Sequence, residues 1–440
     1  MKKLLTVLLV LCFALAAFGK VQAATTVPGG PFASAINIQN IGTEAASGTV
    51  KYVTPAGATA FTSSHSIAVG DVLSIYVPGV GGLAAGEYSV VVSSGQPVAA
   101  ISNFSDSNSG ARYSGANAGS TVWFIPGVYD NYYSYSSEVY AQNVSGAPQD
   151  ITLQVFAPGN ATAVYTNTKT AVPNEASVNW GLNGLAQLNN NVPYSAKVSA
   201  AGDVVVIANT YGTGATAPQL YSFNGFPSGA TSFFVPVAMK NYYGWNAAIA
   251  IQNVSATAAS VSVVFSDPGA TTKNYTIQPN SAQSIYVPSV AGLPNGIFSA
   301  KITSSQAVAV SVNESNSYNR AATFNGVPTA TTTVYAPNVM KAYYKYSSSI
   351  TCQNVGTVAA TMTVTYAGQP GATETSGSIA PSANKVFYLP NNTNLPNSYS
   401  GSAQITSAQP IICVINSNME FPPDNVQSKD MLYSYNGVNK

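Results

Sequence analysis

The chain has 440 residues, of which 46% are hydrophobic and only 7% are charged. An ordinary globular protein carries roughly 25% charged residues, so this chain can build packed cores but must cover them with neutral polar side chains. A single histidine, His65, and only two arginines, Arg112 and Arg320, argue against histidine-based catalysis and against a nucleic-acid partner. At about 100–150 residues per domain, the length predicts three or four domains.

The N-terminus has the features of a signal peptide, which we assign to residues 1–23. Lys2 and Lys3 precede an apolar run over 4–18, and small residues follow at the end of the segment. This order predicts export and cleavage between Ala23 and Ala24. A membrane anchor is the alternative, but the run is short for a span of about 20 residues. No second apolar run of that length follows, so we expect no transmembrane segment in the mature chain.

Removal of the signal peptide changes the charge balance. Three of the 16 basic residues leave (16 − 3 = 13) against 15 acidic ones, for a net charge of −2. A surface with so few charges gives little repulsion between molecules. We therefore expect self-association or association with other cell-surface proteins.

Four landmarks recur in the same order along the chain. The first is AINIQNIG (35–42), repeated as EVYAQNVS (138–145), AIAIQNVS (248–255) and SITCQNVG (349–356). The last is ARYSGA (111–116), repeated as YSFNGF (221–226), ATFNGV (322–327) and YSYNGV (433–438). This order predicts a tandem array of four units. We name them repeats 1 to 4 and delimit them as residues 24–118, 119–228, 229–329 and 330–440.

Within a repeat, apolar residues alternate with polar or small ones. In repeat 3, Ile249 and Ile251 alternate in this way, as do Val261, Val263 and Phe265. Turn residues separate the runs, which predicts seven or eight short strands per repeat and no helix. The fold expected is all-β: four antiparallel β-sandwiches of immunoglobulin-like type in series, with a small barrel per repeat as the alternative. Four sandwiches end to end would form a rod of roughly 120–160 Å.

Asparagines recur at corresponding positions of the repeats. We interpret them as residues that end strands and bond the nearby backbone, a role that Asn favours. The two sets are Asn40, Asn143, Asn253 and Asn354, then Asn103, Asn209, Asn313 and Asn416.

Paired tyrosines open every repeat except the first, which is the only repeat without a preceding neighbour. This distribution predicts that they pack on the preceding repeat; the alternative is that they cover their own repeat. The residues concerned are Tyr132, Tyr133, Tyr242, Tyr243, Tyr343 and Tyr344.

The combination of strand, Gln-Asn turn, Tyr-Val-Pro and closing Tyr-Asn-Gly resembles the tandem immunoglobulin-like repeats of secreted bacterial cell-surface proteins. The resemblance covers nearly the whole mature chain. It implies a β-sandwich fold and a secreted, extracellular or cell-surface location. Proteins of this kind are commonly envelope, matrix or adhesive components, but a shared fold does not establish function.

The residue patterns give no indication of catalysis, a cofactor or a metal site. The acidic residues are scattered, and the chain lacks a Gly-x-Ser-x-Gly elbow, a phosphate loop and zinc spacing. Glu420, Asp424 and Asp430 form the only acidic cluster, which we interpret as part of a solvated loop. We expect a protein that is not an enzyme. Its 27 tyrosines could provide platforms for glycans or partner proteins.

Cys352 and Cys413 are the only cysteines left after signal removal, and export provides an oxidising route. Alignment of the repeats places Cys352 at the position of Ile251, and Cys413 at that of Val310. Both positions face inward, so we predict a disulfide, with two buried thiols as the alternative. The 61-residue separation resembles the inter-sheet bridge of immunoglobulin domains.

The leading functional hypothesis is therefore a secreted structural protein of a cell-surface layer, extracellular matrix or filament. The alternative is an adhesin or carbohydrate-binding protein that uses a terminal repeat. An accessory subunit of an exported enzyme is a third possibility.

Overall fold

The structure is a computed structural model in which residues 5–9, 27–212, 219–316, 320–419 and 429–439 are described. It is all-β, as the alternating pattern predicts, and its helical elements are three short 3-10 turns among the described residues. The predicted cleavage residues Ala23 and Ala24 lie outside the described residues, as do Glu420 and Asp424.

The strands of the first two repeats follow each other at short intervals. Repeat 1 and the segment before it contain β1 (Leu5–Leu9), β2 (Ala33–Asn40), β3 (Ala46–Val53), β4 (Thr59–Ile67), β5 (Val72–Tyr76), η1 (Val77–Gly79), β6 (Ser89–Ser94), β7 (Val98–Ser105) and β8 (Gly110–Ser114). Repeat 2 contains β9 (Ser120–Tyr129), β10 (Tyr135–Asn143), β11 (Gln149–Phe156), β12 (Ala163–Val172), β13 (Ser177–Gly181), β14 (Pro193–Gly212) and β15 (Leu220–Asn224).

The last two repeats contain the same succession of strands. Repeat 3 contains β16 (Ala230–Lys240), β17 (Trp245–Asn253), β18 (Ala259–Phe265), β19 (Thr272–Ile277), β20 (Ala282–Tyr286), η2 (Val287–Ser289), β21 (Gly296–Asn316) and β22 (Ala321–Asn325). Repeat 4 contains β23 (Thr331–Lys341), β24 (Tyr346–Asn354), β25 (Met362–Tyr366), β26 (Gln369–Thr375), β27 (Asn384–Tyr388), η3 (Leu389–Asn391), β28 (Tyr399–Met419), β29 (Leu432–Asn436) and β30 (Val438–Asn439).

The strands pair in the same way in each repeat. In repeat 3, the first half of the long strand β21 lies between β16 and β18, and its second half lies between β17 and β22. In repeat 1 the long strand is divided, which leaves two sheets with the orders β1-β6-β3-β4 and β5-β2-β7-β8. Ile249, Ile251, Val263 and Phe265 are at most 1% exposed, so the predicted alternation does build the core.

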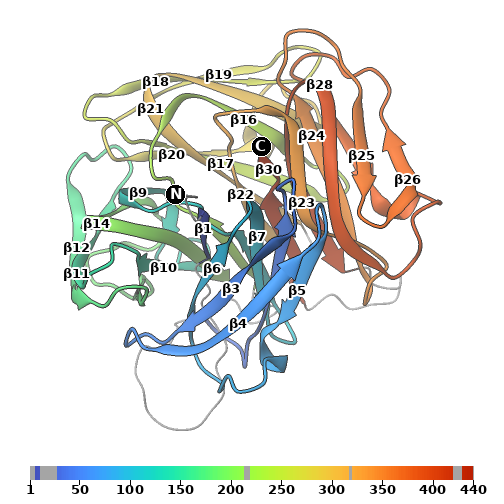
Figure 1. The fold of residues 1–440 in the computed structure, drawn as a ribbon. Coiled ribbons are helices and arrows are strands. Elements are labelled where there is room, and N and C mark those ends of the chain that lie inside the picture. The colour runs from blue at the N-terminus through green and yellow to red at the C-terminus, as the bar shows by residue number, and fades with distance from the viewer. Residues whose placement is uncertain (1–4, 10–26, 213–218, 317–319, 420–428, 440) are drawn as a thin grey trace.

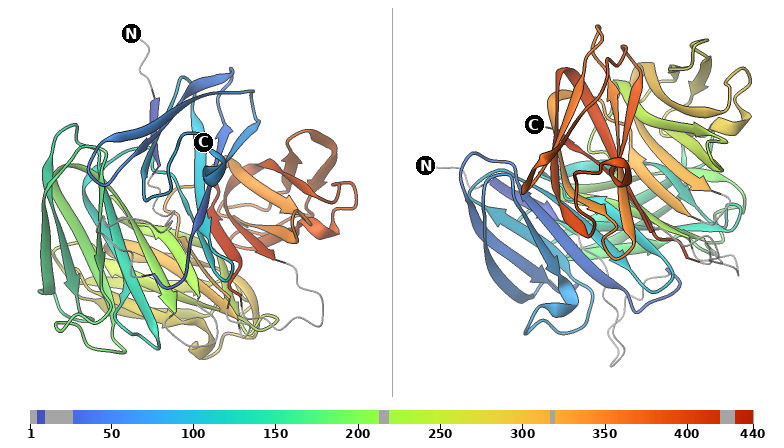
Figure 2. Two further views of the ribbon diagram at one scale, coloured as in Figure 1. Left: turned by 90° about the horizontal axis from the view of Figure 1, so that it is seen from below. Right: turned by 90° about the vertical axis from the view of Figure 1, so that its right-hand side faces the viewer.

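The repeats do not form a rod. The closing strands β8, β15, β22 and β29 contact one another in a closed cycle, with β29 of repeat 4 against β8 of repeat 1. Figures 1 and 2 show the four groups of strands around a common centre, with the first repeat beside the fourth. The accessible surface of 16930 Å² is near the roughly 15,800 Å² expected for a compact monomer of this mass. The predicted end-to-end arrangement is therefore wrong.

The cycle closes because each opening strand packs on the repeat that follows it. β9 contacts β17 and β21, β16 contacts β24 and β28, and β23 returns to contact β2 and β7 of the first repeat. A serine at the start of each long strand adds a hydrogen bond in the same direction, which we call the serine latch. Its four members are Ser89 to Ser177, Ser195 to Asn280, Ser299 to Ser382 and Ser402 to Gly70.

The centre of the ring is held by the closing motif. Asn224, Asn325 and Asn436 each donate a side-chain N–H to the carbonyl of the corresponding residue in the preceding repeat. Asp430, which we placed in a solvated loop, is instead fully buried at this centre. Its carboxylate accepts the backbone N–H groups of Leu220, Ala321 and Leu432, and its own backbone pairs with repeat 1. The reason is that the carboxylate supplies acceptors for three strand ends that meet away from water.

The first set of asparagines has the structural role that the sequence indicates. Asn253 donates to the carbonyls of Thr257 and Ile277 and accepts from the backbone of Ser255, and its three counterparts bond in the same way. The second set differs from expectation. Asn313 and Asn416 lie inside the long strands β21 and β28, not at strand ends, and their side chains bond residues of a neighbouring repeat.

The predicted disulfide is present. Cys352 and Cys413 lie opposite each other on the adjacent strands β24 and β28, with Cα atoms 4.1 Å apart. The internal alignment is therefore right for these positions, since Ile251 pairs with Val310 in the same register. The likeness to an inter-sheet bridge is wrong, because both cysteines belong to one sheet.

Candidate binding site: tyrosine-lined cavities between repeats

The paired tyrosines lie in tight turns between the first two strands of repeats 2, 3 and 4. In repeat 2, the backbone groups of Tyr132 and Tyr135 bond each other at 2.8 and 2.9 Å, which closes the turn. The second tyrosine of each pair, Tyr133, Tyr243 or Tyr344, has a φ of 45–49° and is 72–85% exposed. A bulky residue in the left-handed region costs on the order of 1 kcal/mol or more, and such strain is commonly kept at functional sites.

The tyrosines of repeat 2 line a cavity of about 570 Å³ that they share with repeat 3. Tyr132 stacks on Tyr129 with ring centroids 5.1 Å apart, and the hydroxyl of Tyr129 accepts a hydrogen bond from Asn313 at 3.2 Å. The facing wall includes Tyr286 and Glu314 of repeat 3. The tyrosines therefore face the following repeat, whereas we expected contact with the preceding one.

A corresponding cavity of about 730 Å³ lies between repeats 3 and 4. Tyr242, Tyr243 and Trp245 line it from repeat 3, where Tyr132, Tyr133 and Tyr135 line the first cavity from repeat 2. Tyr388 and Asn416 line it from repeat 4, at the positions that Tyr286 and Asn313 hold in repeat 3. The two cavities are thus built from equivalent strands, because one mode of packing is used at both junctions.

Glu314 is the side chain that the two cavities share. It is fully buried, and its Oε2 accepts a hydrogen bond from Asn416 at 2.7 Å. Its Oε1 and the Oδ1 of Asn416 have no hydrogen-bond partner among the described residues. A buried polar atom without a partner costs about 1–3 kcal/mol, so these two oxygens are available to a ligand with hydrogen-bond donors.

Burial controls the ionisation of Glu314. Loss of contact with water raises the pKa of its carboxyl to about 7, although the hydrogen bond from Asn416 acts in the opposite direction. Glu314 therefore changes charge near neutral pH. It can donate a hydrogen bond when protonated, and it only accepts hydrogen bonds, through both oxygens, when ionised.

The exposed rings lie around the buried pair. Tyr243 and Tyr388 line the larger cavity and are 85% and 43% exposed. Tyr343 and Tyr344 of repeat 4 are also exposed, but neither lines these two cavities. Aromatic faces together with a few convergent polar groups are typical of sites for neutral polar ligands.

The sequence pattern indicated the tyrosine pairs and placed Trp245 at a junction, but it missed Glu314 and Tyr129 and gave Asn416 only a strand-ending role. Its only hint was that Asn313 and Asn416 stand at the same landmark. Within the described part of the chain, no group of three potential metal ligands is found. The described residues also contain no helix that is long and apolar enough to cross a membrane.

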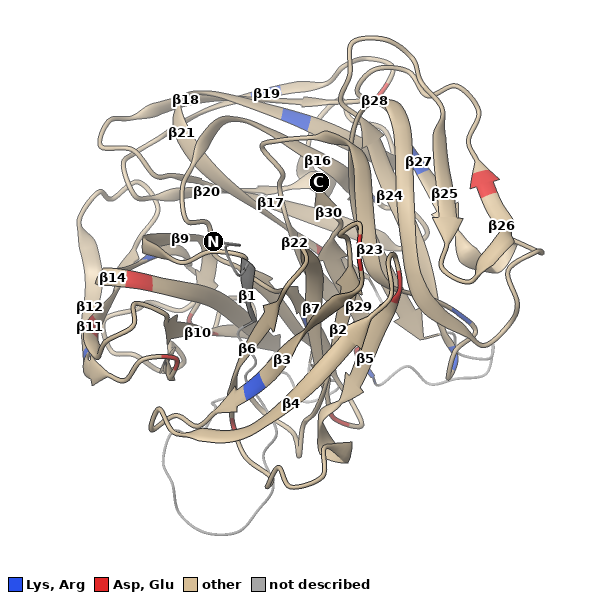
Figure 3. Ribbon diagram, in the orientation of Figure 1, with Lys and Arg blue, Asp and Glu red and all other residues tan. Residues whose placement is uncertain are grey.

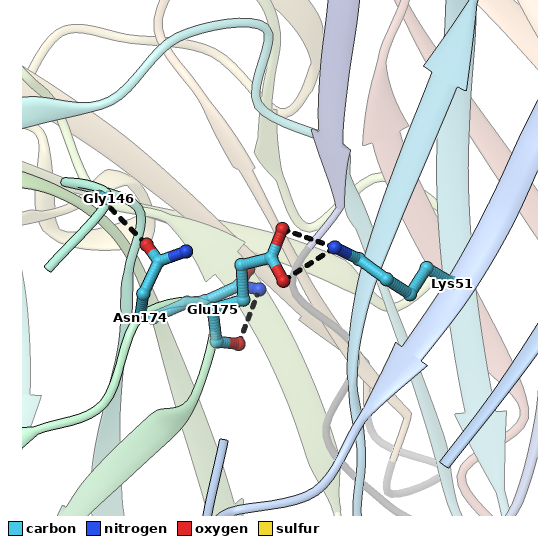
Figure 4. Close-up of polar contacts among 5 residues, drawn as sticks. Lys51, Gly146, Asn174 and Glu175 are labelled. Atoms are coloured by element: carbon cyan, nitrogen blue, oxygen red, sulfur yellow. Dashed lines mark hydrogen bonds and ion pairs between the residues drawn. The ribbon is translucent and has the colours of Figure 1, made fainter. Parts of the chain in front are cut away.

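Charged residues are few throughout the ring. Figure 3 shows them scattered over the strands and not gathered on one element. Among the described residues one ion pair is found, between Lys51 of repeat 1 and Glu175 of repeat 2, at 2.6 Å (Figure 4). It lies at a junction without either tyrosine-lined cavity.

Comparison with protein-family models finds no match, and comparison with curated proteins finds none either. Among solved structures, Thermotoga maritima 1070 is 18% identical over 24% of this chain and 94% of its own, with a TM-score of 0.22. The Anabaena sensory rhodopsin transducer is 18% identical over 20% of this chain and 93% of its own, with a TM-score of 0.17. A Streptomyces avermitilis α-L-rhamnosidase is 8% identical over 92% of this chain, with a TM-score of 0.12. Likenesses at this level carry no argument about function.

Proposed function

We propose that this protein is exported and binds carbohydrate in the cavities between repeats 2 and 3 and between repeats 3 and 4. This proposal changes the expected location of the site, because the cavities lie at internal junctions and not on a terminal repeat. We further propose that the four units are immunoglobulin-like sandwiches. The observation that carries the binding proposal is the buried Glu314–Asn416 pair beneath exposed tyrosine rings, in which Oε1 of Glu314 and Oδ1 of Asn416 have no hydrogen-bond partner among the described residues.

The chemistry of these cavities suits a sugar. A sugar ring offers apolar C–H faces that stack on aromatic rings, and hydroxyls that both donate and accept hydrogen bonds. The Glu314 carboxyl is the only carboxyl group lining either cavity among the described residues. Glycoside hydrolysis generally requires a pair of carboxyl groups on either side of the bond. The arrangement therefore supports binding and not cleavage.

A structural protein of a surface layer is the second candidate. The observation that favours it is the low charge of the surface, which opposes association only weakly. The closed ring disfavours a filament, because the surface of repeat 4 that could recruit another chain already contacts repeat 1. A layer would have to use other surfaces.

The binding proposal can be tested on a glycan array followed by calorimetry with the best ligand. We expect Tyr243→Ala and Tyr388→Ala each to weaken binding about 2- to 10-fold, since an aromatic contact contributes about 0.5–1.5 kcal/mol. Tyr344→Ala is the matched control, because this equivalent tyrosine lines neither cavity. Equal loss in all three variants, or no glycan retained by the native protein, would refute the proposal.

A further inference from the structure

Repeat 1 lacks the opening strand that the other repeats encode. Repeats 2, 3 and 4 begin with β9, β16 and β23, each paired with the first half of its long strand. The sequence before β2 contains only the short stub Val27-Pro28 where these strands stand in the other repeats. Among the described residues from Val27 onward, β6 thus has one neighbouring strand, β3.

The N-terminal segment fills this vacancy in the same register. β1 pairs antiparallel with β6, and Val7 lies opposite Val92. In repeats 2, 3 and 4 the corresponding pairs are Trp123 with Val198, Phe233 with Ile302, and Val334 with Ile405. Two residues further on, Leu9 lies opposite Val90, as Val235 lies opposite Ala300. β1 therefore occupies the backbone position of an opening strand, residue for residue.

The position demands an apolar strand. Trp123, Phe233 and Val334 are at most 3% exposed, and the next alternate residues, Ile125, Val235 and Ala336, are 0% exposed. A sheet edge without its neighbour presents unpaired N–H and C=O groups, which readily pair with another chain. Such an edge binds an added strand through its main chain, and pockets for alternate side chains select the sequence.

We propose that the β6 edge is an acceptor site for a strand donated by a partner protein, opened when residues 1–23 are removed. The proposal rests on the export and cleavage proposed above, and it does not depend on carbohydrate binding. The donor is an extended segment that runs antiparallel to β6 with apolar residues at two alternate positions. It would attach the ring to another protein of the cell surface without opening the ring.

The test uses the chain exported from a bacterial host, with its N-terminus determined by mass spectrometry. The probe is a synthetic peptide with the sequence of β16, ATSFFVPVAMK (230–240), because that strand occupies the equivalent place in repeat 3. We expect the mature chain to bind it, to melt several degrees higher, and to gain hydrogen-exchange protection at residues 89–94. A peptide with Phe233→Asp and Val235→Asp should bind at least 10-fold more weakly.

A self-complemented variant provides the folding control. In it, the β16 sequence is fused by a flexible linker ahead of Val27; this chain should fold, bind no added peptide and show protected β6 amides. If the mature chain folds only when the peptide is present during refolding, the proposal also holds. Equal binding of both peptides, no protection at residues 89–94, or a folded protein that retains residues 1–23 would overturn it. If the mature chain instead forms a dimer that does not bind the peptide, the β6 edge pairs with a second copy of this chain. That result would overturn the proposal of a strand from a partner protein.

Discussion

Two junctions of the ring use equivalent surfaces but differ in whether the chain links the two repeats directly. They are the junction between repeats 4 and 1 and the junction between repeats 3 and 4. β23 packs on repeat 1 as β16 packs on repeat 4, and the serine latch is present in both, through Ser402 and Ser299. The chain links repeats 3 and 4 directly, whereas repeats 4 and 1 meet only through non-covalent contacts. A direct link raises the effective concentration of two surfaces, so the linked junction requires less intrinsic affinity.

The closing junction carries additional contacts that fit this difference. Arg112 of repeat 1 is 3% exposed, donates to Asn338 at 3.1 Å and to Ser417 at 3.4 Å, and lies over the rings of Tyr433 and Tyr435. Arg320, at the linked junction, donates to Asn418 at 2.8 Å. Both arginines of the chain therefore connect to repeat 4. A buried cation thus closes the ring at the junction that the chain does not bridge.

The largest effect is expected for Asp430→Ala. Asp430 lies at the centre of the ring, so its loss should weaken the linked junction and the closing junction alike. Three backbone N–H groups would lose a buried acceptor, at about 1–3 kcal/mol each, so we expect a loss of roughly 3–9 kcal/mol in unfolding free energy. Small-angle scattering should show the radius of gyration rising from about 22 Å to above about 30 Å. Asp430→Asn, which keeps one acceptor oxygen, should be milder. An unchanged radius in Asp430→Ala would contradict the central role.

Removing the disulfide tests how much the stability of repeat 4 contributes, since this repeat takes part in both junctions. Replacing Cys352 by Ile and Cys413 by Val restores the residues found at these positions in repeat 3. Closing a loop of this length stabilises by about 4 kcal/mol in the chain-entropy model, and we expect the double variant to lose up to that amount. Urea denaturation of the two proteins measures the difference. Because the bridge lies within one repeat, scattering should still show a closed ring, and an opened ring would mean that the bridge also supports the junctions.

The disulfide prediction rests on a feature that the sequence of a single repeat already indicates, whereas the Asp430 prediction does not. The two-residue alternation located β17 and β18, and alignment of the repeats placed Cys352 opposite Cys413. Such features depend on contacts within one repeat, and each repeat carries its own copy of the pattern. The sandwich strands could therefore be predicted without knowing how the repeats meet.

The candidate site could not be predicted in the same way. Glu314 is one acidic residue in a strand, and its burial arises only when β28 of repeat 4 covers it. Asp430 follows a Pro-containing stretch that looks solvated until three other closing strands converge on it. The closing landmark is visible in all four repeats, but nothing in its sequence shows that Asn325 bonds the preceding repeat.

Stability should depend on pH through the linked junction, where Glu314 lies. Its pKa is raised from 4.5 to about 7, so the folded state holds a proton that the unfolded state releases between these values. The contribution of Glu314 to stability is therefore full below about pH 4.5 and is lost as pH rises to about 7, by on the order of 3 kcal/mol. Denaturation at pH 4.5 and pH 8 measures this, and Glu314→Gln should reduce the difference. Stability that rises over this range in the native protein but not in Glu314→Gln would contradict the assignment.

A smaller effect is expected when the two arginines are compared directly. Arg112→Ala removes two hydrogen bonds from a charged donor and its contacts with two rings, for a loss of about 2–3 kcal/mol. Arg320→Ala should cost less and leave the ring closed, because the chain still links repeats 3 and 4. Scattering should therefore separate the variants, with open particles populated only for Arg112→Ala. If both variants had the same particle shape, the junction between repeats 4 and 1 would not depend on its arginine more than the linked junction does.

The smallest effect is expected at the junction between repeats 1 and 2, through the ion pair of Lys51 and Glu175 (Figure 4). Both side chains keep about a quarter of their surface in water, at 29% and 24%, so solvent screens the attraction. Such pairs contribute about 0.2–1 kcal/mol, and we expect Lys51→Met to lose about 0.5 kcal/mol. The latch between Ser89 and Ser177 and the link through the chain both remain, so the ring should stay closed. Raising the salt concentration to 1 M should shrink the difference in stability between the native protein and the variant, since only the native protein has this pair to screen. A loss above about 2 kcal/mol, or an opened ring, would show that this exposed pair holds repeats 1 and 2 together, as Arg112 holds repeats 4 and 1 together.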